Sequence, residues 1–290
     1  MSYEYPYYSV SKIRSFMDER NANPLKKWGQ NFITDPNTLD FIINSIDKDA
    51  LAKTNSVAEI GIGLGALTHK LALLNKKLFL FEIDPVYIEN MKSMEYFDST
   101  NSVLYEGDVL NTISNLKDEK IFLTGNLPYY ITSEILTTSL KSVPNLTGAI
   151  FMVQKEFADR ICNEISSLSI FVSAFGKFSF LRKISPSCFY PKPDASSALI
   201  RFTPTNHSYS KMQIDKLELI LRTFFWGKRK TIGKSISEAP FLDAKEFNRD
   251  YPDLRKEILD SLAQNKIELR LRPEELKVDD YHKILKGLAS

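Results

Sequence analysis

A buried strand that runs directly into a glycine-rich turn and a helix constrains the fold of this chain more than any other feature. The strand covers residues 56–60, the turn is Gly61-Ile62-Gly63-Leu64-Gly65, and the helix continues to about Leu74. Glycine permits a tight turn and a close approach of the backbone to a ligand at the carboxyl end of a parallel strand. The next apolar strand, residues 78–81, ends in Glu82, where dinucleotide-binding folds place the carboxylate that binds ribose hydroxyls. This order of elements predicts an α/β fold with a parallel sheet.

Two later strands bring further polar side chains to the same edge of the predicted sheet. Residues 102–105 are followed by Asp108, and residues 120–123 lead to Asn126. Asp108 is a candidate acceptor for the amine of a bound adenine, and the alternative is a turn aspartate that caps its own backbone. For Glu82 the alternative is the solvated end of a strand. The turn after residue 60 lacks the Lys-Ser/Thr pair of a phosphate-binding loop, so the sequence disfavours ATP hydrolysis.

The run Asn126-Leu127-Pro128-Tyr129 indicates chemistry on an adenine base. The side-chain carbonyl of Asn126 and the backbone carbonyl of Leu127 can accept both hydrogens of the exocyclic amine, which aims its nitrogen lone pair. Pro128 stiffens the turn, and Tyr129 offers a face on which an extruded base can stack. Taken alone, these residues fit a polar strand end and turn before a buried tyrosine better, because short motifs recur by chance. The glycine turn and the acidic strand ends favour the adenine-binding interpretation.

These segments resemble the small-subunit ribosomal RNA adenine dimethyltransferases, a family whose founding bacterial member is tied to kasugamycin sensitivity. The resemblance extends from Lys26 through nearly the whole remaining chain. It implies a Rossmann-like, S-adenosylmethionine-dependent methyltransferase fold with a mostly parallel sheet, followed by a small all-helical domain. The matching segments are Gly29 to Ile33, Glu59 to Thr68, Glu82 to Asp84, Gly107-Asp108, Asn126 to Tyr129, Phe189 to Pro193, Lys228 to Thr231 and Leu271 to Leu276.

The activity implied by this resemblance is dimethylation of the exocyclic amines of two adjacent adenosines. These adenosines lie in a hairpin loop near the 3′ end of small-subunit ribosomal RNA. The implied cofactor is S-adenosylmethionine, and the implied partner is the immature small subunit, the pre-30S particle, during ribosome biogenesis in the cytoplasm. We expect the chain to act as a monomer.

The family pattern, carried over residue by residue, also implies a set of site residues. Asn126, Tyr129 and Phe189 form the pocket for the target base, joined by the carbonyl of Leu127 from the chemistry given above. The sequence departs from the pattern at Ile62, where proline is usual, and at Tyr130, where asparagine is common. The implied contacts with S-adenosylmethionine are Asn31, Ile33, Gly61, Glu82, Asp108 and Asn126.

The distribution of charge suits contact with RNA better than the overall charge of +2 does. Residues 201–290 carry 18 Lys and Arg against 14 Asp and Glu, whereas residues 1–200 carry a net charge of −2. Between residues 222 and 234 there are five cations and no acid, interleaved with aromatic side chains. Such a stripe is typical of phosphate binding, although charge runs are often only solvated faces. The candidate RNA-binding residues are Arg222, Lys228, Arg229, Lys230 and Lys234.

We predict three segments in the chain. Residues 1–25 form an N-terminal extension, a short helical lead-in to which the sequence assigns no role. Residues 26–204 form the methyltransferase domain, with a fifth strand at 148–153 and a last strand that contains 199–202. Residues 205–290 form a helical domain, because the apolar periodicity there becomes helical. The family resemblance and the basic stripe imply that this domain binds ribosomal RNA. One expected buried helix face comprises Leu254, Ile258, Leu259 and Leu262.

Other classes of protein remain as alternatives or are disfavoured. Cys162 and Cys188 fit no metal-ligand spacing, and the three histidines are widely separated, so we predict no metal. No apolar run is long enough to span a membrane, and the N-terminal residues resemble neither a secretory signal nor a transit peptide. Two alternatives stay open: a large-subunit ribosomal RNA adenine methyltransferase of the macrolide-resistance type, and a non-catalytic assembly or transcription factor on the same fold.

Overall fold

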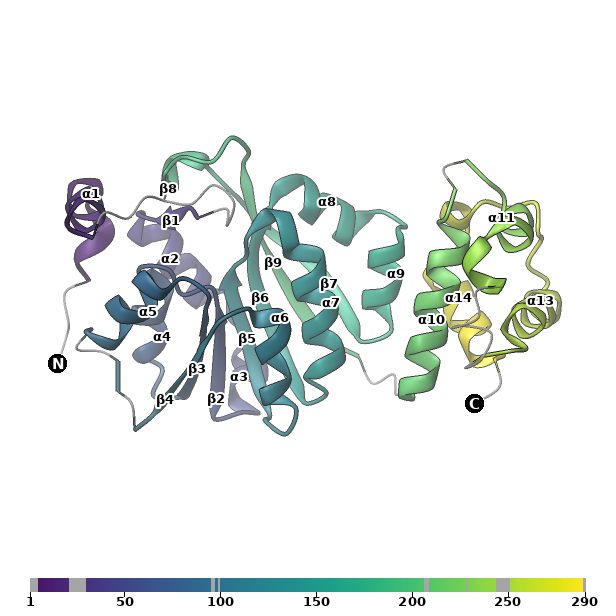
Figure 1. Cartoon of the computed structure of the whole chain (residues 1–290), viewed down its shortest axis with the longest axis horizontal. Helices are drawn as coiled ribbons and strands as arrows, with labels where there is room; N and C mark the ends of the chain where they lie inside the picture. Colours follow the sequence, from purple (N-terminus) through teal and green to yellow (C-terminus); the bar gives the residue numbers. More distant parts are fainter. Residues whose placement is uncertain are drawn as a thin grey trace. The chain divides into compact units, whose positions relative to one another are not determined.

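The computed structural model (Figure 1) describes residues 5–20, 30–94, 97–98, 100–205, 209–227, 229–243 and 251–288. The chain divides into two compact units. The first comprises residues 1–158 and 178–204, and the second comprises residues 159–177 and 205–290. The sequence places residues 159–177 in the methyltransferase domain, but they group with the C-terminal helices, because helix α9 (Ser167–Ser173) contacts α10 (Lys211–Phe224) and α14 (Val278–Lys286).

A seven-stranded sheet with the strand order β4-β3-β2-β5-β6-β9-β7 is the framework of the first unit. The pairs that link β4, β3, β2, β5 and β6 are parallel, and β9 runs antiparallel to β6. The expectation of a mostly parallel sheet is therefore confirmed. The strands are β2 (Ser56–Ile60), β3 (Lys77–Glu82), β4 (Ser102–Glu106), β5 (Ile121–Asn126), β6 (Leu146–Gln154), β7 (Gly176–Ile184) and β9 (Ser197–Pro204).

Two features of the strands were not predicted from the sequence. Strand β7 lies at the edge of the sheet and exposes Lys177, Ser179 and Arg182. Polar and apolar residues alternate only from Lys177 to Phe180, because Leu181 interrupts the pattern. A separate two-stranded sheet joins β1 (Phe32–Ile33) to β8 (Phe189–Tyr190), with Phe32 opposite Tyr190 and Ile33 opposite Phe189. Strands of two residues carry no periodicity. This small sheet nevertheless fixes the segment around residue 31 beside the main sheet.

Helices follow the strands and begin at recognisable caps. Asp35, Asp47, Asp84 and Asp108 each accept a hydrogen bond from a backbone N–H in the first turn of the helix that follows. The helical segments that begin in this unit are η1 (Pro6–Tyr8), α1 (Val10–Glu19), α2 (Pro36–Asn44), α3 (Lys48–Ala52), α4 (Ala66–Ala72), α5 (Pro85–Lys92), α6 (Val109–Thr112), η3 (Ile113–Leu116), η4 (Tyr129–Ile131), α7 (Thr132–Ser142), α8 (Lys155–Asn163) and η5 (Pro186–Cys188).

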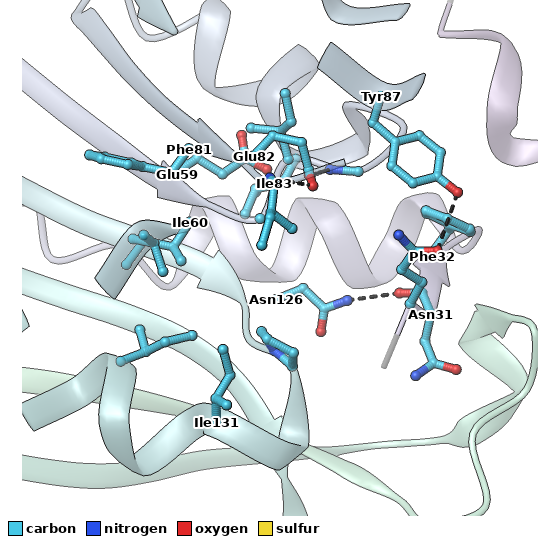
Figure 2. Close-up of a pocket in the computed structure, with 18 of the residues that line it drawn as sticks. Asn31, Phe32, Glu59, Ile60, Phe81, Glu82, Ile83, Tyr87, Asn126 and Ile131 are labelled. Atoms are coloured by element: carbon cyan, nitrogen blue, oxygen red, sulfur yellow. Dashed lines mark hydrogen bonds between the residues drawn. The ribbon is translucent and has the colours of Figure 1, made fainter. Parts of the chain in front are cut away.

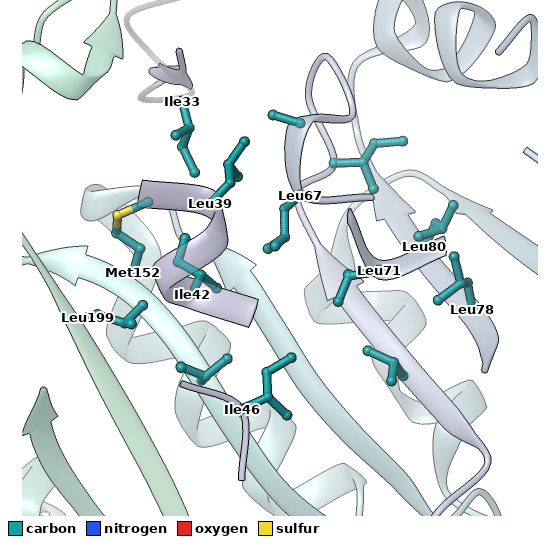
Figure 3. Packing of buried hydrophobic residues seen from close by; sticks show 14 of the residues in the cluster. Ile33, Leu39, Ile42, Ile46, Leu67, Leu71, Leu78, Leu80, Met152 and Leu199 are labelled. Atoms are coloured by element: carbon teal, nitrogen blue, oxygen red, sulfur yellow. The ribbon is translucent and has the colours of Figure 1, made fainter. Parts of the chain in front are cut away.

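The core of the first unit lies between one face of the sheet and helices α2 and α4 (Figure 3). Alternate strand residues face this layer, because successive side chains of a strand point to opposite faces of the sheet. Phe79 and Phe81 point the other way and stack on Tyr105. The main packing residues are Leu39 and Ile42 of α2, Leu67 and Leu71 of α4, and Leu78, Leu80, Met152 and Leu199 of the strands.

The second unit is helical in its C-terminal part, as the sequence predicts. Leu254, Ile258 and Leu262 are buried, but Leu259, expected on the same face, is 37% exposed. The four-residue spacing from 254 to 258 and 262 already fills the buried stripe. Besides α9, α10 and α14, the segments are α11 (Ile232–Glu238), η6 (Pro240–Asp243), α13 (Leu254–Gln264) and η7 (Pro273–Glu275). Among the described residues, no helix is long and apolar enough to cross a membrane.

Candidate functional site

A cavity of about 230 Å³ opens at the carboxyl ends of β2, β3 and β5 in the first unit (Figure 2). The segment before β1 closes one side of it, and the turn after β5 forms another. Of the four residues predicted for catalysis, Asn126 lines the cavity, whereas Leu127, Tyr129 and Phe189 do not. All six residues that the sequence assigns to the cofactor line this cavity: Asn31, Ile33, Gly61, Glu82, Asp108 and Asn126.

The glycine turn has a backbone that only glycine adopts easily. Gly61, Gly63 and Gly65 have φ angles of 74°, 51° and 83°. The N–H of Gly61 donates to the carbonyl of Phe81 at 2.9 Å, which ties the turn to β3. A Cβ atom on Gly63 would lie 3.2 Å from the ring of Phe32, so that ring packs tightly against the turn. The turn is thus held against β3 and Phe32, and Gly61 and Gly63 line the cavity.

Glu82 organises the loops around the cavity. Its Oε2 accepts the N–H of Gly63, and its Oε1 accepts the N–H groups of Ile83 and Asp84, each at 2.9 Å. Burial raises the pKa of this carboxyl, and the three backbone N–H groups oppose that shift. Glu82 is therefore not the solvated strand end that the sequence left open. It is a buried acceptor that links the glycine turn to the start of α5.

Glu59 is a second buried carboxyl at the cavity, and sequence reasoning did not single it out. The residue is 2% exposed, and its Oε2 accepts the hydroxyl of Thr68 at 2.6 Å. Burial raises the pKa of Glu59 to about 8, and the nearby charge of Glu82 raises it further while the Thr68 hydroxyl lowers it. The available signal was an acidic residue inside the strand 56–60, between Ala58 and Ile60. Two buried carboxyls near one another favour a cationic ligand.

Asp108 follows β4 and caps the N-terminus of helix α6. Its Oδ1 accepts the N–H of Leu110 at 2.9 Å, so the capping role considered from the sequence is present. Asp108 also lines the cavity, and within the described part of the chain its Oδ2 has no hydrogen-bond partner. Tyr130, the departure from the family pattern, lines the same cavity and is 53% exposed. One Asp108 oxygen therefore holds the helix and the other can accept from a ligand.

Asn126 is oriented by a bond to the segment before β1 (Figure 2). Its Nδ2 donates to the backbone carbonyl of Asn31 at 2.8 Å. This bond commits the amide nitrogen, which leaves Oδ1 as an acceptor without a partner among the residues described. The side chain is thus fixed with its carbonyl oxygen available. This is the arrangement that gripping an amine requires.

The other three residues predicted for the base pocket are placed differently. The side chain of Leu127 is buried, and its N–H donates to the carbonyl of Met152 at 2.9 Å, so only its own carbonyl can serve a ligand. The hydroxyl of Tyr129 lies 2.6 Å from Oγ of Ser197, and burial raises its pKa. Phe189 is 5% exposed and packs in the core opposite Ile33.

Helix α1, to which the sequence assigned no role, supports the wall of the cavity from behind. Phe16 stacks on Tyr87 with ring centroids 6.3 Å apart, and Tyr87 meets Phe32 edge to face at 5.3 Å. Ile13, Phe16 and Met17 of this helix form one buried cluster with Phe32, Leu64 and Tyr87. Those last three residues line the cavity. Helix α1 therefore forms an outer layer of the site.

The predicted RNA-binding residues lie in the second unit, around the turn between α10 and α11. Arg222, Arg229 and Lys234 are exposed, and Lys230 is partly buried. Lys228 lies outside the described residues. The aromatic residues of this stripe differ in exposure: Phe224 is fully buried, Phe225 stacks on Tyr281, and Trp226 is 40% exposed.

Comparison with known proteins assigns the family. The family model described as "Ribosomal RNA adenine dimethylase" matches residues 21–250. The chain belongs to the ribosomal RNA adenine dimethylase family. A relative from Mycoplasma mycoides named "Ribosomal RNA small subunit methyltransferase A" is 35% identical over 271 residues, which is 89% of this chain and 95% of the relative. A relative of the same name from Staphylococcus aureus is 31% identical over 288 residues, covering 94% of this chain and 93% of the relative.

Solved structures agree with this ribosomal RNA adenine dimethylase assignment. A dimethyladenosine transferase from Plasmodium falciparum has a TM-score of 0.69 and 29% identity, and the match covers 87% of this chain and 95% of that one. The 23S rRNA methyltransferase ErmE has a TM-score of 0.58 at 21% identity, covering 89% and 99% of the two chains, which shows the fold alone. The fold is that of S-adenosylmethionine-dependent methyltransferases, as the sequence predicts.

The cavity of this ribosomal RNA adenine dimethylase fits S-adenosylmethionine. The cofactor has a ribose diol, an adenine amine, and positive charges on its sulfonium and amino groups. Glu59 and Glu82, whose pKa values are raised by burial, would be stabilised as carboxylates by those charges. The open Oδ2 of Asp108 can accept an amine hydrogen. Among the described residues no cluster of three or more His, Cys, Asp or Glu could hold a metal ion.

Proposed function

We propose that this chain transfers methyl groups from S-adenosylmethionine to the exocyclic amines of two adjacent adenosines. The adenosines lie in a hairpin loop near the 3′ end of small-subunit ribosomal RNA, and the reaction takes place on the pre-30S particle in the cytoplasm. The relatives named as small-subunit methyltransferases support the choice of this RNA. The observation that carries the proposal is the fixed side chain of Asn126, whose nitrogen is bound to Asn31 and whose oxygen is open at the cavity.

Asn126 and Leu127 would prepare the target amine for reaction. The lone pair of an adenine amine is delocalised into the ring, so the nitrogen is a poor nucleophile. Acceptance of its two hydrogens by Oδ1 of Asn126 and the carbonyl of Leu127 draws the lone pair out of conjugation and aims it. S-adenosylmethionine would supply an electrophilic methyl group. The residues of the chain supply position rather than a nucleophile, and the amine proton leaves to solvent.

We assign the remaining site residues as follows. Glu82 would accept the ribose hydroxyls, Asp108 the cofactor amine, and Asn31, Ile33 and Gly61 would contact the rest of the cofactor. Their shared position around one cavity supports this assignment. Tyr129 would stack the target base, and Phe189 would join it by turning out of the core position that it occupies opposite Ile33. A loop base is easier to extrude than a paired one. The exposed cations of the second unit would bind ribosomal RNA phosphates, and the chain would act as a monomer.

A labelling experiment tests the proposed function. The protein is incubated with S-adenosylmethionine that carries a labelled methyl group and with immature small subunits from cells that lack this methylation. Digestion then maps the label. We expect two dimethylated adenosines in the small-subunit RNA and no label in separately supplied large subunits. Label only in the large subunit would favour the macrolide-resistance activity, and no label in either would favour a non-catalytic assembly factor.

A further inference from the structure

The turn between α10 and α11 holds an exposed tryptophan against a lysine. Nζ of Lys230 lies 3.7 Å from the centroid of the Trp226 ring. The indole is 40% exposed and follows the end of α10, whose last turn contains the exposed Arg222. Single apolar side chains on a surface are common. What distinguishes this one is the set of contacts that keeps its ring in place.

Lys230 is itself held from two sides. Its ammonium donates to Oε2 of Glu238 at 2.5 Å, and the pKa of the Glu238 carboxyl is lowered, first by this hydrogen bond. Its aliphatic stem lies against Gly227, where an added Cβ would meet Cγ, Cδ and Cε of Lys230 at 2.5–2.9 Å. Gly227 thus leaves the space that the stem occupies. Trp226, Lys230 and Glu238 form a connected brace.

This brace gives Lys230 a different role from its neighbours. A lysine that contacts a ring and pairs with a carboxylate has its charge largely compensated, so it adds little to phosphate binding. Arg229 is exposed on the same turn, and Lys234 is exposed although its Nζ lies 3.8 Å from Oε1 of Glu238. Residues 201–290 carry a net charge of +4. A surface of this sign fits a polyanion rather than an apolar protein segment. An aromatic ring among such cations is the usual platform for a nucleic-acid base.

We propose that Trp226 is a stacking platform for an unpaired RNA base, and that Lys230 and Glu238 hold its ring for that purpose. The inference rests on the proposed function, since it takes ribosomal RNA as the ligand of the second unit. Because the brace orders the indole before RNA arrives, less side-chain freedom is lost on binding. The site is separate from the pocket for the target base, which belongs to the first unit. It contributes affinity for RNA and no chemistry.

The test compares two strands that have the same phosphates. One is a short oligoadenylate, and the other is an abasic strand of equal length. Trp226→Ala should weaken binding of oligoadenylate by about 5- to 150-fold, the equivalent of ~1–3 kcal/mol for one stacked base. Binding of the abasic strand should not change. Trp226→Phe should restore part of the affinity, and the quenching of tryptophan emission by oligoadenylate should be smaller in Trp226→Ala than in the natural chain.

Salt dependence separates the brace from the phosphate contacts. Lys230→Met keeps the stem without the charge, and Arg229→Met is its matched control on the same turn. Loss of one phosphate contact lowers the slope of log affinity against log salt by about 0.7 on a single strand. We expect this change for Arg229→Met and none for Lys230→Met. A full slope change for Lys230→Met would show that Lys230 binds phosphate and that the brace is wrong.

Two results would overturn the platform itself. Equal weakening on both strands in Trp226→Ala would mean that the indole only supports the basic turn. Normal oligoadenylate binding combined with weaker binding to immature small subunits would mean that Trp226 contacts a ribosomal protein. Methylation of immature subunits by the natural chain is measured in parallel. If methylation occurs while Trp226→Ala behaves normally, only this inference fails; if the strands behave as expected but no methyl is transferred, the proposed function fails instead.

Discussion

Replacing Glu59 by glutamine should remove a large pH dependence from the stability of the ligand-free protein. Burial raises the pKa of Glu59 to about 8, against an ordinary value of 4.5. Below pH 4.5 both the folded and the unfolded chain hold the proton, and the contribution of this group to stability is fully present. As pH rises toward 8, the unfolded chain releases the proton while the folded chain keeps it, so stability falls.

The size of this pH dependence is set by the single proton that the folded chain keeps on Glu59 and the unfolded chain releases. The free energy of unfolding should fall by somewhat more than about 1 kcal/mol per pH unit, or roughly 2–3 kcal/mol between pH 5 and pH 7. Urea unfolding of the natural chain and of Glu59→Gln at several pH values gives the difference between them, in which most other titrating groups cancel. The glutamine keeps an oxygen for the hydroxyl of Thr68, so the fold should be retained.

Thr68→Val is the matched control. It removes the hydroxyl that lowers the pKa of Glu59, so the decline in stability should continue to higher pH than in the natural chain. A difference between the natural chain and Glu59→Gln that stays constant from pH 5 to pH 7 would refute the reasoning. It would mean that the buried carboxyl is already ionised in the folded protein.

Three further predictions concern the cofactor cavity. Binding of S-adenosylmethionine at pH 7 should release a proton from Glu59, because the cationic ligand lowers the pKa of this carboxyl. Calorimetry in buffers of different ionisation enthalpy should detect the released proton, and Glu59→Gln should abolish the release. Glu82→Ala leaves three backbone N–H groups without their acceptor, so stability should fall by about 1 kcal/mol or more per group and cofactor affinity at least about tenfold. The loss should be smaller in Glu82→Gln. Wild-type cofactor affinity by calorimetry in a Glu82→Ala protein that circular dichroism shows to be folded would contradict the assignment. Phe16→Ala should raise the KM for S-adenosylmethionine by about 2- to 12-fold with little change in kcat, because the cavity wall formed by Phe32 and Tyr87 loses its support. Lys12 is exposed on the same helix, so Lys12→Ala should change neither constant. An unchanged KM in Phe16→Ala would show that α1 does not support the site.

The sequence predicts the framework of the site well because parallel strands deliver their carboxyl ends to one edge. Glu82 and Asn126 are the last residues of their strands, Gly61 and Asp108 come just after theirs, and all four line the cavity. The strand ends are local features, and the edge that they share follows from the topology. Even the acceptor role proposed for Asn126 has a local signature in the proline and tyrosine that follow it.

The parts that the sequence did not predict depend on contacts between distant segments. Phe16 of helix α1 stacks on Tyr87, which lines the cavity. The two residues are 71 positions apart, and no pattern within either segment predicts their contact. The buried state of Glu59 depends on Thr68 and on the layers around the strand. Leu259 matched a helical apolar pattern yet is exposed, since a helix has more apolar positions than its neighbour can cover.

For the basic stripe between residues 222 and 234, the sequence does not predict which partner each cation has. Five cations between residues 222 and 234 look equivalent in the sequence. In the structure Lys230 is engaged by Trp226 and Glu238, and Lys234 also lies 3.8 Å from Glu238, whereas Arg229 is exposed. Charge type and spacing give the sign of the surface, but the partners of each charge are set by side-chain packing around the turn.

The methylation rate of Asn126→Ala tests the central claim most directly. Immature small subunits are mixed with the variant and with the natural chain at saturating S-adenosylmethionine, and single-turnover transfer of labelled methyl is followed. Loss of the acceptor that positions the target amine should slow transfer by at least about a hundredfold, while circular dichroism and particle binding stay close to those of the natural chain. A folded Asn126→Ala that binds the particle and transfers methyl at a near-normal rate would contradict the account.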